Sequence, residues 1–313
     1  MSAASIHDLI ILGGGPAGMT AAIYAARANL DTLVLECNIT GGLVNSTYIV
    51  ENFPSWPAIH GLRLMDKVRQ HVDNCRVPVE ELCEITELRL QDEVKTVISE
   101  DGEYKARAAI LATGRRPVPL QTTTEAPQQV HHCAICDGAL YVGKHVLVVG
   151  GGNSAFDESL YLLALGAARI TLIEIMDHYS AAPSAQDALF SSGKAQGRLQ
   201  TRVHDLIMEN RRLKAAVLEN TVTGERETYA VDGIFVFLGQ LPNNALFRDQ
   251  VLLTEQGYIQ VAADMSTNIP GVFGAGDIND KRYRQIITAM ADGAIAALAA
   301  ERWLRTQKAT RAL

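Results

Sequence analysis

Two cysteines separated by two residues, Cys133 and Cys136, form the motif with the most specific chemistry in this chain, because of what stands on either side of them. One glycine-rich stretch, Gly13–Gly18, opens the chain, and a second, Gly150–Ala155, begins just beyond the cysteine pair. Glycines at this spacing are typical of dinucleotide-binding turns, and a CxxC pair can cycle between dithiol and disulfide. Together and in this order, the motifs favour the passage of two electrons from a bound nucleotide cofactor into a disulfide.

The first glycine stretch stands where a dinucleotide-binding βαβ unit requires it. The unit is expected to consist of a buried strand, a helix and a second strand at residues 6–12, 19–28 and 32–35. Gly13 permits the tight turn, Gly15 lets the backbone approach a pyrophosphate, and Gly18 lets the helix pack closely on the strand. The helix N-terminus offers N–H groups to phosphates. Glu36, about 20 residues beyond the glycines, can accept hydrogen bonds from a ribose.

The same pattern recurs in the middle of the chain. A strand, a helix and a strand are expected at residues 144–149, 156–165 and 169–173. Gly150 and Gly152 form the turn, and Glu174 ends the second strand. A further buried strand runs into Asp277, whose carboxylate suits sugar hydroxyls, and an alanine-rich helix is expected over residues 285–305. The sequence therefore predicts an α/β protein with two Rossmann-like, three-layer nucleotide-binding domains.

Composition and charge limit the class of protein. The chain has 313 residues, of which 48% are hydrophobic and 20% are charged, as expected for two globular domains. A net charge of −7 argues against a nucleic-acid binder, which needs a basic face. No apolar run reaches the roughly 18–20 residues that span a bilayer, so no membrane association is expected. The first nine residues show no basic region of a secretion signal, which predicts a cytoplasmic location.

The other cysteines give no sign of a disulfide framework. The chain has five cysteines, and Cys37, Cys75 and Cys83 are scattered, so we expect them to be small buried apolar side chains. An alternative for the CxxC pair is half of a zinc site with His131 and His132, but adjacent histidines and a single CxxC fit the usual zinc spacings poorly. We expect these two histidines to lie in a loop beside the thiolate.

These motifs together resemble the low-molecular-weight thioredoxin reductases, over nearly the whole chain. The matching stretches are Gly13–Gly18 with Glu36, Glu51–Pro54, Ala112–Gly114, Cys133–Gly138, Gly150–Ala155, Val231–Gly239, Gly274–Asp277 and Tyr283–Gln285. The family consists of two-domain flavoproteins. The resemblance implies an FAD-binding domain built from residues 1–117 and 245–313, and a central NAD(P)-like domain, residues 118–244, that carries the CxxC. It also implies a homodimer and a thioredoxin-like protein disulfide as partner.

The resemblance assigns roles to individual residues. FAD would be held by Gly13, Gly15, Gly18, Glu36, Asn52, Thr113, Gly114, Asp277, Arg284 and Gln285. Cys136 would face the flavin, Cys133 would attack the substrate disulfide, and Asp137 would act as general acid and base. The CxxC spacing lowers the pKa of one thiol and so raises its thiolate fraction. Leu43 stands where the family usually has a glutamine near the flavin, which puts one flavin contact in doubt.

A larger departure concerns the electron donor. The family typically reads His-Arg-Arg-Asp-x-Phe-Arg-Ala where this chain has Glu174–Ala181. The three arginines, replaced here by Ile175, Met176 and Ser180, hold the 2′-phosphate of NADPH, because a guanidinium fork matches phosphate oxygens. Glu174 would also repel a dianion. We therefore expect NADPH to be a poor donor, and ferredoxin, NADH or a second bound flavin to take its place.

The second glycine stretch keeps enough of its pattern to hold a nucleotide. The predicted second site consists of Gly150, Gly152, Asn153, Ser154, Glu174 and Tyr179. Glu174 suits an unphosphorylated ribose diol, as in NADH or FAD, and Tyr179 either stacks on a bound ring or packs in the protein. Two alternatives stay open: an ordinary NADPH-dependent enzyme with other phosphate contacts, and a flavin redox sensor without turnover. The intact Cys133–Asp137 motif weighs against the sensor.

Overall fold

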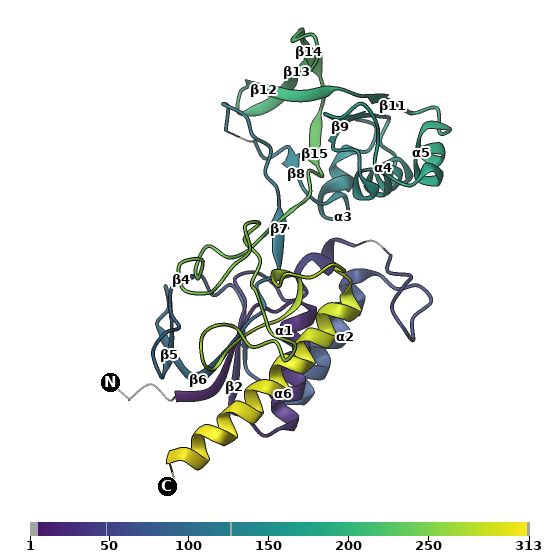
Figure 1. The fold of residues 1–313 in the computed structure, drawn as a ribbon. Helices are drawn as coiled ribbons and strands as arrows, with labels where there is room; N and C mark the ends of the chain where they lie inside the picture. Colours follow the sequence, from purple (N-terminus) through teal and green to yellow (C-terminus); the bar gives the residue numbers. More distant parts are fainter. Residues whose placement is uncertain (1–5, 48, 126, 312–313) are drawn as a thin grey trace. The chain divides into compact units, whose positions relative to one another are not determined.

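The chain folds into two α/β units, each described here by itself (Figure 1). The structure is a computed structural model that describes residues 6–47, 49–125 and 127–311. One unit is formed by both ends of the chain, residues 1–116 and 242–313, and the other by residues 117–241. We call them the terminal unit and the central unit. The expectation of no secretion signal depends partly on residues 1–5, which lie outside the described ranges.

The terminal unit contains a seven-stranded sheet with helices on one face. Its strands are β1 (Ile6–Leu12), β2 (Thr32–Leu35), β3 (Val79–Glu80), β4 (Ile85–Arg89), β5 (Lys95–Ser99), β6 (Glu103–Leu111) and β17 (Val272–Gly274). Its helices are α1 (Pro16–Arg27), α2 (Gly61–Asn74) and α6 (Ile286–Arg311), with short 3₁₀ turns η1 (Gly42–Ser46) and η3 (Gly276–Ile278). The strand order is β3-β2-β1-β6-β5-β4, and β17 also pairs with β6. Strands β1, β2, β3, β6 and β17 are parallel.

Both faces of the β1 strand are buried, which explains its unbroken apolar sequence. Successive side chains of a strand point to opposite faces. Leu9 and Ile11 belong to the core beneath α1, α2 and α6, whereas Ile10 belongs to the core on the other face. Helices α1 and α6 pack side by side (Figure 1). Gly293 allows this approach, because a Cβ there would lie 2.1 Å from the carbonyl oxygen of Ala17.

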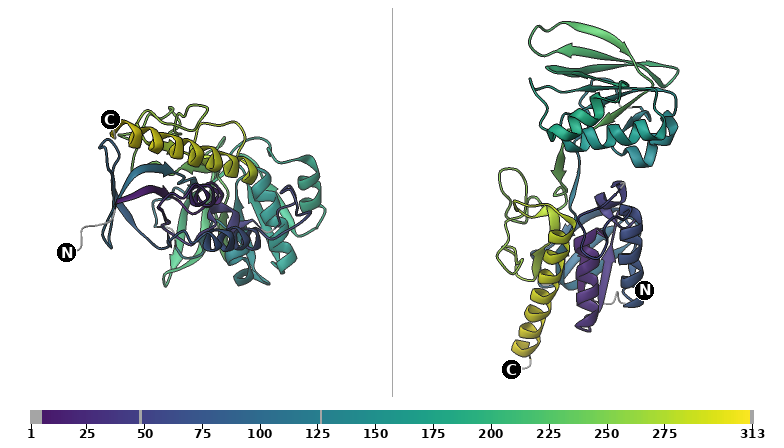
Figure 2. Two further views of the ribbon diagram at one scale, coloured as in Figure 1. Left: turned by 90° about the horizontal axis from the view of Figure 1, so that it is seen from below. Right: turned by 90° about the vertical axis from the view of Figure 1, so that its right-hand side faces the viewer.

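The central unit has three layers (Figure 2, right). Its parallel sheet, in the order β11-β10-β9-β15-β8, consists of β8 (Val130–His131), β9 (His145–Val149), β10 (Arg169–Ile173), β11 (Ala195–Arg198) and β15 (Gly233–Val236). One face packs on helices, and the other packs on an antiparallel sheet. The helices are α3 (Ala134–Asp137), α4 (Asn153–Leu165) and α5 (Pro183–Phe190), with the 3₁₀ turn η2 (Gly138–Tyr141). The antiparallel strands are β12 (Thr201–Glu209), β13 (Arg212–Asn220) and β14 (Arg226–Ala230).

The two passages of chain between the units pair as β7 (Arg115–Pro117) and β16 (Gln240–Pro242). The expected fold class of two Rossmann-like units is confirmed. Helices α1 and α4 begin earlier than expected, directly at the glycine turns, because Pro16 fits the first helical position and Gly152 serves as the cap. Within the described ranges, we find no helix with both the length and the apolar character to cross a bilayer.

Candidate active site

The first glycine turn has the shape that a pyrophosphate requires. Gly13 adopts a φ of +112°, and a Cβ on it would lie 2.3 Å from the carbonyl oxygen of Ala112. A Cβ on Gly18 would lie 1.8 Å from the carbonyl oxygen of Gly13, so the helix can approach the turn this closely only because residue 18 is glycine. Around Gly15 no atom lies within 4 Å of the Cβ position, which leaves room at the N-terminus of α1. The first helical residue, Pro16, has no N–H to satisfy.

Glu36 lies beside this turn and stabilises it through hydrogen bonds. Its side chain is buried, and its two oxygens accept hydrogen bonds from the backbone N–H groups of Gly14, at 2.6 Å, and Asn38, at 2.8 Å. The Cys37 thiol is a third, weak donor, 3.5 Å from Oε1, and since a carboxylate has about four acceptor positions, one remains for a ribose hydroxyl. The residue therefore combines a structural role with the predicted binding role.

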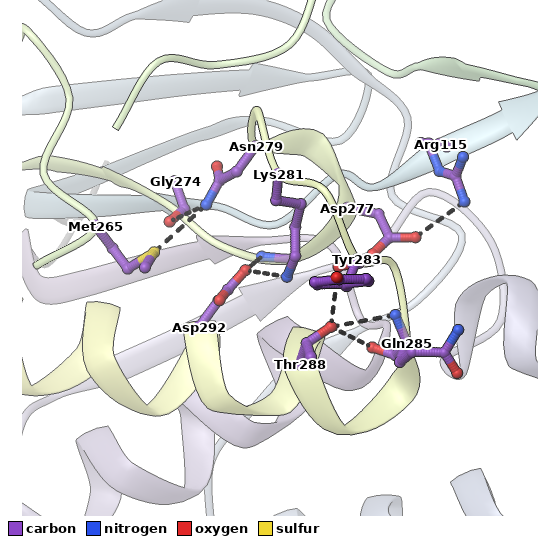
Figure 3. A network of polar contacts seen from close by, with 11 residues as sticks. Arg115, Met265, Gly274, Asp277, Asn279, Lys281, Tyr283, Gln285, Thr288 and Asp292 are labelled. Atoms are coloured by element: carbon purple, nitrogen blue, oxygen red, sulfur yellow. Dashed lines mark hydrogen bonds and ion pairs between the residues drawn. The ribbon is translucent and has the colours of Figure 1, made fainter. Parts of the chain in front are cut away.

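Asp277 offers an unsatisfied acceptor (Figure 3). Its Oδ2 accepts a hydrogen bond from Nη2 of Arg115 at 3.1 Å, whereas its Oδ1 is buried and has no hydrogen-bond partner among the described residues. The turn before it is held by Asp292, whose Oδ2 accepts the N–H of Gly276 at 3.1 Å and the ammonium of Lys281 at 2.6 Å. A buried acceptor without a donor is costly, so a ligand hydroxyl fits here.

The remaining predicted FAD residues have distinct surroundings. Asn52 donates from Nδ2 to Oε1 of Gln285 at 3.1 Å, which brings two predicted residues together across 233 positions of sequence. The Arg284 guanidinium lies 4.3 Å from the ring centroid of Tyr258, and its Nε is buried without a partner among the described residues. Thr113 Oγ1 donates to a neighbouring backbone carbonyl, and Gly114 next to it adopts a φ of +60°.

These observations fit a dinucleotide in the terminal unit. Gly13, Glu36, Thr113 and Asp277 follow β1, β2, β6 and β17, whose carboxyl ends share one edge of the sheet. Ligands of open α/β sheets bind at that edge. The uncapped N-terminus of α1 suits the phosphates, and the orphaned Asp277 oxygen suits a sugar hydroxyl. When bound, FAD would supply a two-electron carrier.

We expect the purified protein to be yellow and to release FAD on denaturation, at about one flavin per chain. The turn around Gly13 and Gly15 is built for a pyrophosphate, which FMN lacks. Chromatography of the released flavin distinguishes the two. FMN would contradict the assignment of the first turn, and a stoichiometry near two would place a second flavin in the central unit.

The cysteine pair lies in the central unit, at the start of α3. Cys133 and Cys136 form a disulfide, with Cα atoms 5.4 Å apart. Cys133 is the N-cap of α3, and its Sγ accepts the backbone N–H of Cys136 at 3.1 Å. After reduction this N–H would favour the thiolate on Cys133, the form that attacks disulfides. Asp137 follows directly, half-exposed, with Oδ2 2.9 Å from Nδ1 of His131.

The expectation that His131 lies in a loop is wrong. It ends the short strand β8, is only 8% exposed, and is paired through that strand to β15. A strand of two residues is too short to show the alternation of apolar and polar residues that reveals longer strands. His132, by contrast, is partly exposed, and its Nδ1 lies 3.3 Å from the carbonyl oxygen of Val236. Within the described part of the chain, no group of three or more His, Cys, Asp or Glu side chains is arranged to hold a metal ion.

Glu158 on α4 supports the start of α3 and titrates near neutrality. Its Oε2 accepts the N–H of Ala134 at 2.9 Å. Burial, together with the charge of Asp157, raises the pKa of Glu158 to about 7, against the lowering effect of that hydrogen bond. The folded protein thus keeps a proton that the unfolded chain would release at lower pH.

The variant Glu158→Gln should remove this pH dependence, because glutamine keeps the acceptor without titrating. Because the pKa of Glu158 is higher in the folded protein than in the unfolded chain, its proton stabilises the fold. This stabilisation is complete below the pKa of Glu158 in the unfolded chain, and it is lost as the pH rises through the pKa in the folded protein, about 7. The free energy of unfolding of the variant, relative to that of the wild type, should rise by about 1–3 kcal/mol from mildly acidic to mildly alkaline pH. Urea unfolding at the two pH values measures this, and an equal difference at both would contradict it.

The second glycine turn is covered by the segment that follows β10. Gly150 adopts a φ of +125°. The backbone N–H groups of Ser180 and Ala181 donate to the carbonyl oxygen of Gly151, at 2.9 and 3.1 Å. Asn153 Oδ1 accepts the N–H of Ala182 at 2.8 Å, so this predicted ligand also anchors the segment. Gly152 is the N-cap of α4, and Ser154 lies in its first turn. Only the Ser180 hydroxyl, at 3.7 Å, lies within 4 Å of a Cβ placed on Gly152.

Tyr179 packs in the protein, which is one of the two roles expected for it. Its ring contacts Phe156 edge-on, with centroids 5.2 Å apart, and Phe190 at 5.7 Å. Its buried hydroxyl has no hydrogen-bond partner among the described residues, and a Cβ on Gly197 would lie 2.2 Å from it. Glu174 stays beside the turn, where its Oε1 accepts the N–H of Met176 at 3.1 Å.

The expectation that the three other cysteines are buried holds only in part. Cys83 is buried, Cys75 is half-buried and Cys37 is exposed. The thiol of Cys37 lies 3.5 Å from Oε1 of Glu36. The expectation of burial was based on the apolar character of cysteine alone. Cys37 is exposed because it lies just after the end of β2, where the chain leaves the sheet.

Several residues of the site were missed from the sequence. Arg115 bonds to Asp277, 162 positions away in the sequence. Only the position of Arg115 directly after Thr113 and Gly114 could have indicated that it belongs to the site. Asp292 carried a usable signal, as a single carboxylate in the alanine-rich stretch 286–300. The link between His131 and Asp137 had no signal beyond proximity in sequence.

A family model described as pyridine nucleotide-disulphide oxidoreductase matches residues 7–293. The chain belongs to this family. A protein of Clostridium pasteurianum described as the 34.2 kDa protein in rubredoxin operon is 40% identical over 301 residues, 95% of this chain and 97% of that protein. The thioredoxin reductase of Bacillus subtilis is 37% identical over 313 residues, 99% of this chain and 98% of that one.

Solved structures agree with this assignment. The crystal structure of Lactococcus lactis thioredoxin reductase matches with a TM-score of 0.86 at 34% identity, covering 96% of this chain and 99% of that one. Family membership, these similarities and the disulfide together identify a flavin-dependent disulfide oxidoreductase of the thioredoxin-reductase type.

Proposed function

We propose that this oxidoreductase takes electrons from a donor other than NADPH, passes them through FAD in the terminal unit to Cys133–Cys136, and reduces thioredoxin or a similar protein disulfide. The thioredoxin reductases among its relatives support the acceptor. The expected homodimer, a state that light scattering measures, belongs to the same proposal.

The observation that carries the donor proposal is the missing 2′-phosphate clamp. Ile175 and Met176 are each 53% exposed, where the family has arginines, and neither side chain can bind a phosphate. Arg198 lies on the neighbouring strand, but its guanidinium is 4.5 Å from the ring centroid of Tyr229 and pairs with Glu227. That cation is already engaged, so it is a poor substitute for the clamp.

The size of the effect follows from the lost contacts. Each charge-assisted hydrogen bond contributes about 1.5–3 kcal/mol. Losing two or three of them weakens NADPH binding by a factor of about 100 or more, at 1.4 kcal/mol per tenfold. The carboxylate of Glu174 beside the turn adds repulsion to a 2′-phosphate, whereas it can accept hydrogen bonds from a ribose diol. This favours NADH, a second flavin or a protein donor such as ferredoxin over NADPH.

The chain's own residues can complete the disulfide exchange. Once the pair is reduced, the Cys133 thiolate attacks a substrate disulfide and forms a mixed disulfide, with release of one thiolate. The Cys136 thiolate then attacks Cys133, restoring the Cys133–Cys136 disulfide and releasing the second thiolate. Asp137, next to Cys136, exchanges the protons that thiol and thiolate forms require.

The reduction of oxidised thioredoxin, assayed with one donor at a time, tests this proposal. NADPH, NADH and photochemically reduced ferredoxin are supplied in turn at equal concentration. We expect thioredoxin thiols to appear with NADH or ferredoxin at a rate at least about tenfold above that with NADPH. A rate with NADPH that equals or exceeds the others would favour an ordinary NADPH-dependent thioredoxin reductase. No thiols with any donor would favour the redox sensor.

A further inference from the structure

Beside the cysteine pair, three side chains of the central unit form a hydrogen-bonded chain that ends at Asp137. The Tyr141 hydroxyl lies 2.7 Å from Nε2 of His131, and Nδ1 of the same ring lies 2.9 Å from Oδ2 of Asp137. Asp137 directly follows Cys136. The imidazole therefore connects a buried phenol to the carboxylate of the residue that follows Cys136 in sequence.

The packing fixes the imidazole in this orientation. His131 is 8% exposed, and its ring stacks on Phe235 with centroids 5.0 Å apart at 29°. Tyr141 is 3% exposed and meets both rings edge-on. A buried ring that stacks on Phe235 and meets Tyr141 edge-on has little room to turn, so its two nitrogens keep their two contacts.

The hydrogen-bond directions follow from the protonation of the phenol. Burial, together with the charge of Asp137, raises the pKa of Tyr141 to about 12, so the hydroxyl keeps its proton and donates to Nε2. In the neutral ring the proton then sits on Nδ1, which donates to the Asp137 carboxylate. When Nε2 takes a further proton, the Tyr141 hydroxyl turns to accept from it, and the imidazolium is still paired with that carboxylate.

The charged groups around this chain come from every neighbouring element. The charge of Asp232, before β15, raises the pKa of Tyr141 as that of Asp137 does, and the Lys144 ammonium lies 5.2 Å from the Tyr141 ring centroid. On α4, Glu158 accepts the N–H of Ala134. His132 directs its Nδ1 to the carbonyl oxygen of Val236, 3.3 Å away.

An isolated carboxyl group is poorly suited to supply a proton at neutral pH, because it loses its own near pH 4. An imidazole loses its proton at about pH 6.5. When the two groups share a hydrogen bond, their titration belongs to the pair. The pair can therefore take up one proton and return it as a unit.

We propose that His131 is a positioning residue for the dithiol–disulfide reaction: it orients Asp137 and stores the proton that Asp137 exchanges with the cysteines. This rests on the proposed function only in taking Cys133–Cys136 as the redox pair and Asp137 as its acid and base. As Cys133 becomes the thiolate that attacks a disulfide, its proton moves to the pair. When the second thiolate leaves, the pair returns that proton to it.

The electrons and protons balance in this scheme. The two cysteine sulfurs are oxidised to a disulfide and give two electrons to the substrate disulfide, which becomes two thiols. Two S–H protons leave the enzyme, one through the His131–Asp137 pair and one from the second cysteine to the first leaving thiolate. One S–S bond breaks and one forms.

A single-turnover assay with a small aromatic disulfide tests the inference without nucleotide, ferredoxin or thioredoxin. The whole protein is reduced with dithiothreitol, separated from it, and mixed anaerobically with the disulfide over about pH 5–9. The wild-type rate should show an inflection that depends on the pair, besides that of the thiols. His131→Asn should lose this inflection and react at least about tenfold more slowly at neutral pH.

Matched variants separate a proton role from a structural one. Asp137→Asn, at a half-exposed position, should also lose the inflection, and the double variant should be no slower than Asp137→Asn alone, because both residues act through one carboxylate. His132→Asn, which removes the adjacent imidazole, should keep the wild-type profile. An inflection retained in His131→Asn or in Asp137→Asn would overturn the inference. So would a double variant whose loss is the product of the single losses. If His131→Asn does not fold, the profile of Asp137→Asn decides alone.

Failure of this test and failure of the proposed function are distinguishable. A protein that reacts with the small disulfide as described but accepts electrons from NADPH refutes the donor proposal only. A protein that reduces thioredoxin with NADH or ferredoxin, yet shows the same pH profile with and without His131, refutes the present inference only.

Discussion

Cys133→Ser is expected to lose the reduction of protein disulfides by about a thousandfold or more, the scale on which removal of a nucleophile acts. Serine keeps the volume and the N-cap position but has no thiolate to attack a disulfide. Cys136→Ser should be equally inactive, because a mixed disulfide at Cys133 could not be resolved. Thiol counting should show about two new thiols on reduction of the wild type and none in either variant.

The half-buried Cys75 provides the control, since it lies on the terminal unit and outside the pair. Cys75→Ser should retain wild-type turnover and the gain of two thiols. The flavin of Cys133→Ser should still be reduced by the physiological donor, because the defect lies after the flavin. Full activity in Cys133→Ser would exclude this residue as the attacking thiol.

Restoring the arginine clamp should convert the enzyme toward NADPH. The variant Glu174→His, Ile175→Arg, Met176→Arg, Ser180→Arg places the family's residues on a segment that is already anchored to Gly151 and Asn153. Flavin reduction at low NADPH should accelerate by about 100-fold, from two or three regained charge-assisted hydrogen bonds. The rate with NADH should not rise, because NADH has no 2′-phosphate.

A matched variant tests whether charge is responsible. Replacing residues 175, 176 and 180 by glutamine, with Glu174→His kept, adds similar length and polarity without a guanidinium. It should recover only the part of the gain that comes from removing the Glu174 carboxylate. Equal gains in the two variants would show that the arginines are not the decisive groups.

The framework of the site could be predicted because it depends on local patterns. The apolar stretch before Gly13 has both faces buried, and the glycines and Glu36 recur at distances fixed by one βαβ unit. These constraints act over a few dozen residues, so a single sequence displays them. The second unit was visible for the same reason.

What the sequence could not show depends on contacts between distant segments or on burial. Tyr179 has the residue type of a stacking side chain, but the aromatic neighbours that enclose it, Phe156 and Phe190, come from α4 and α5. His131 was expected in a loop because two residues of strand carry no periodicity. Its buried environment depends on Phe235, about a hundred positions away, which no local pattern indicates.

The central claim is that electrons reach this flavin from a donor other than NADPH. Anaerobic rapid mixing of the oxidised wild-type protein with micromolar NADPH, followed by flavin absorbance, tests it most directly. We expect slow or incomplete bleaching with NADPH, and rapid bleaching of the same sample with NADH or reduced ferredoxin. Rapid and complete bleaching by micromolar NADPH would contradict the claim.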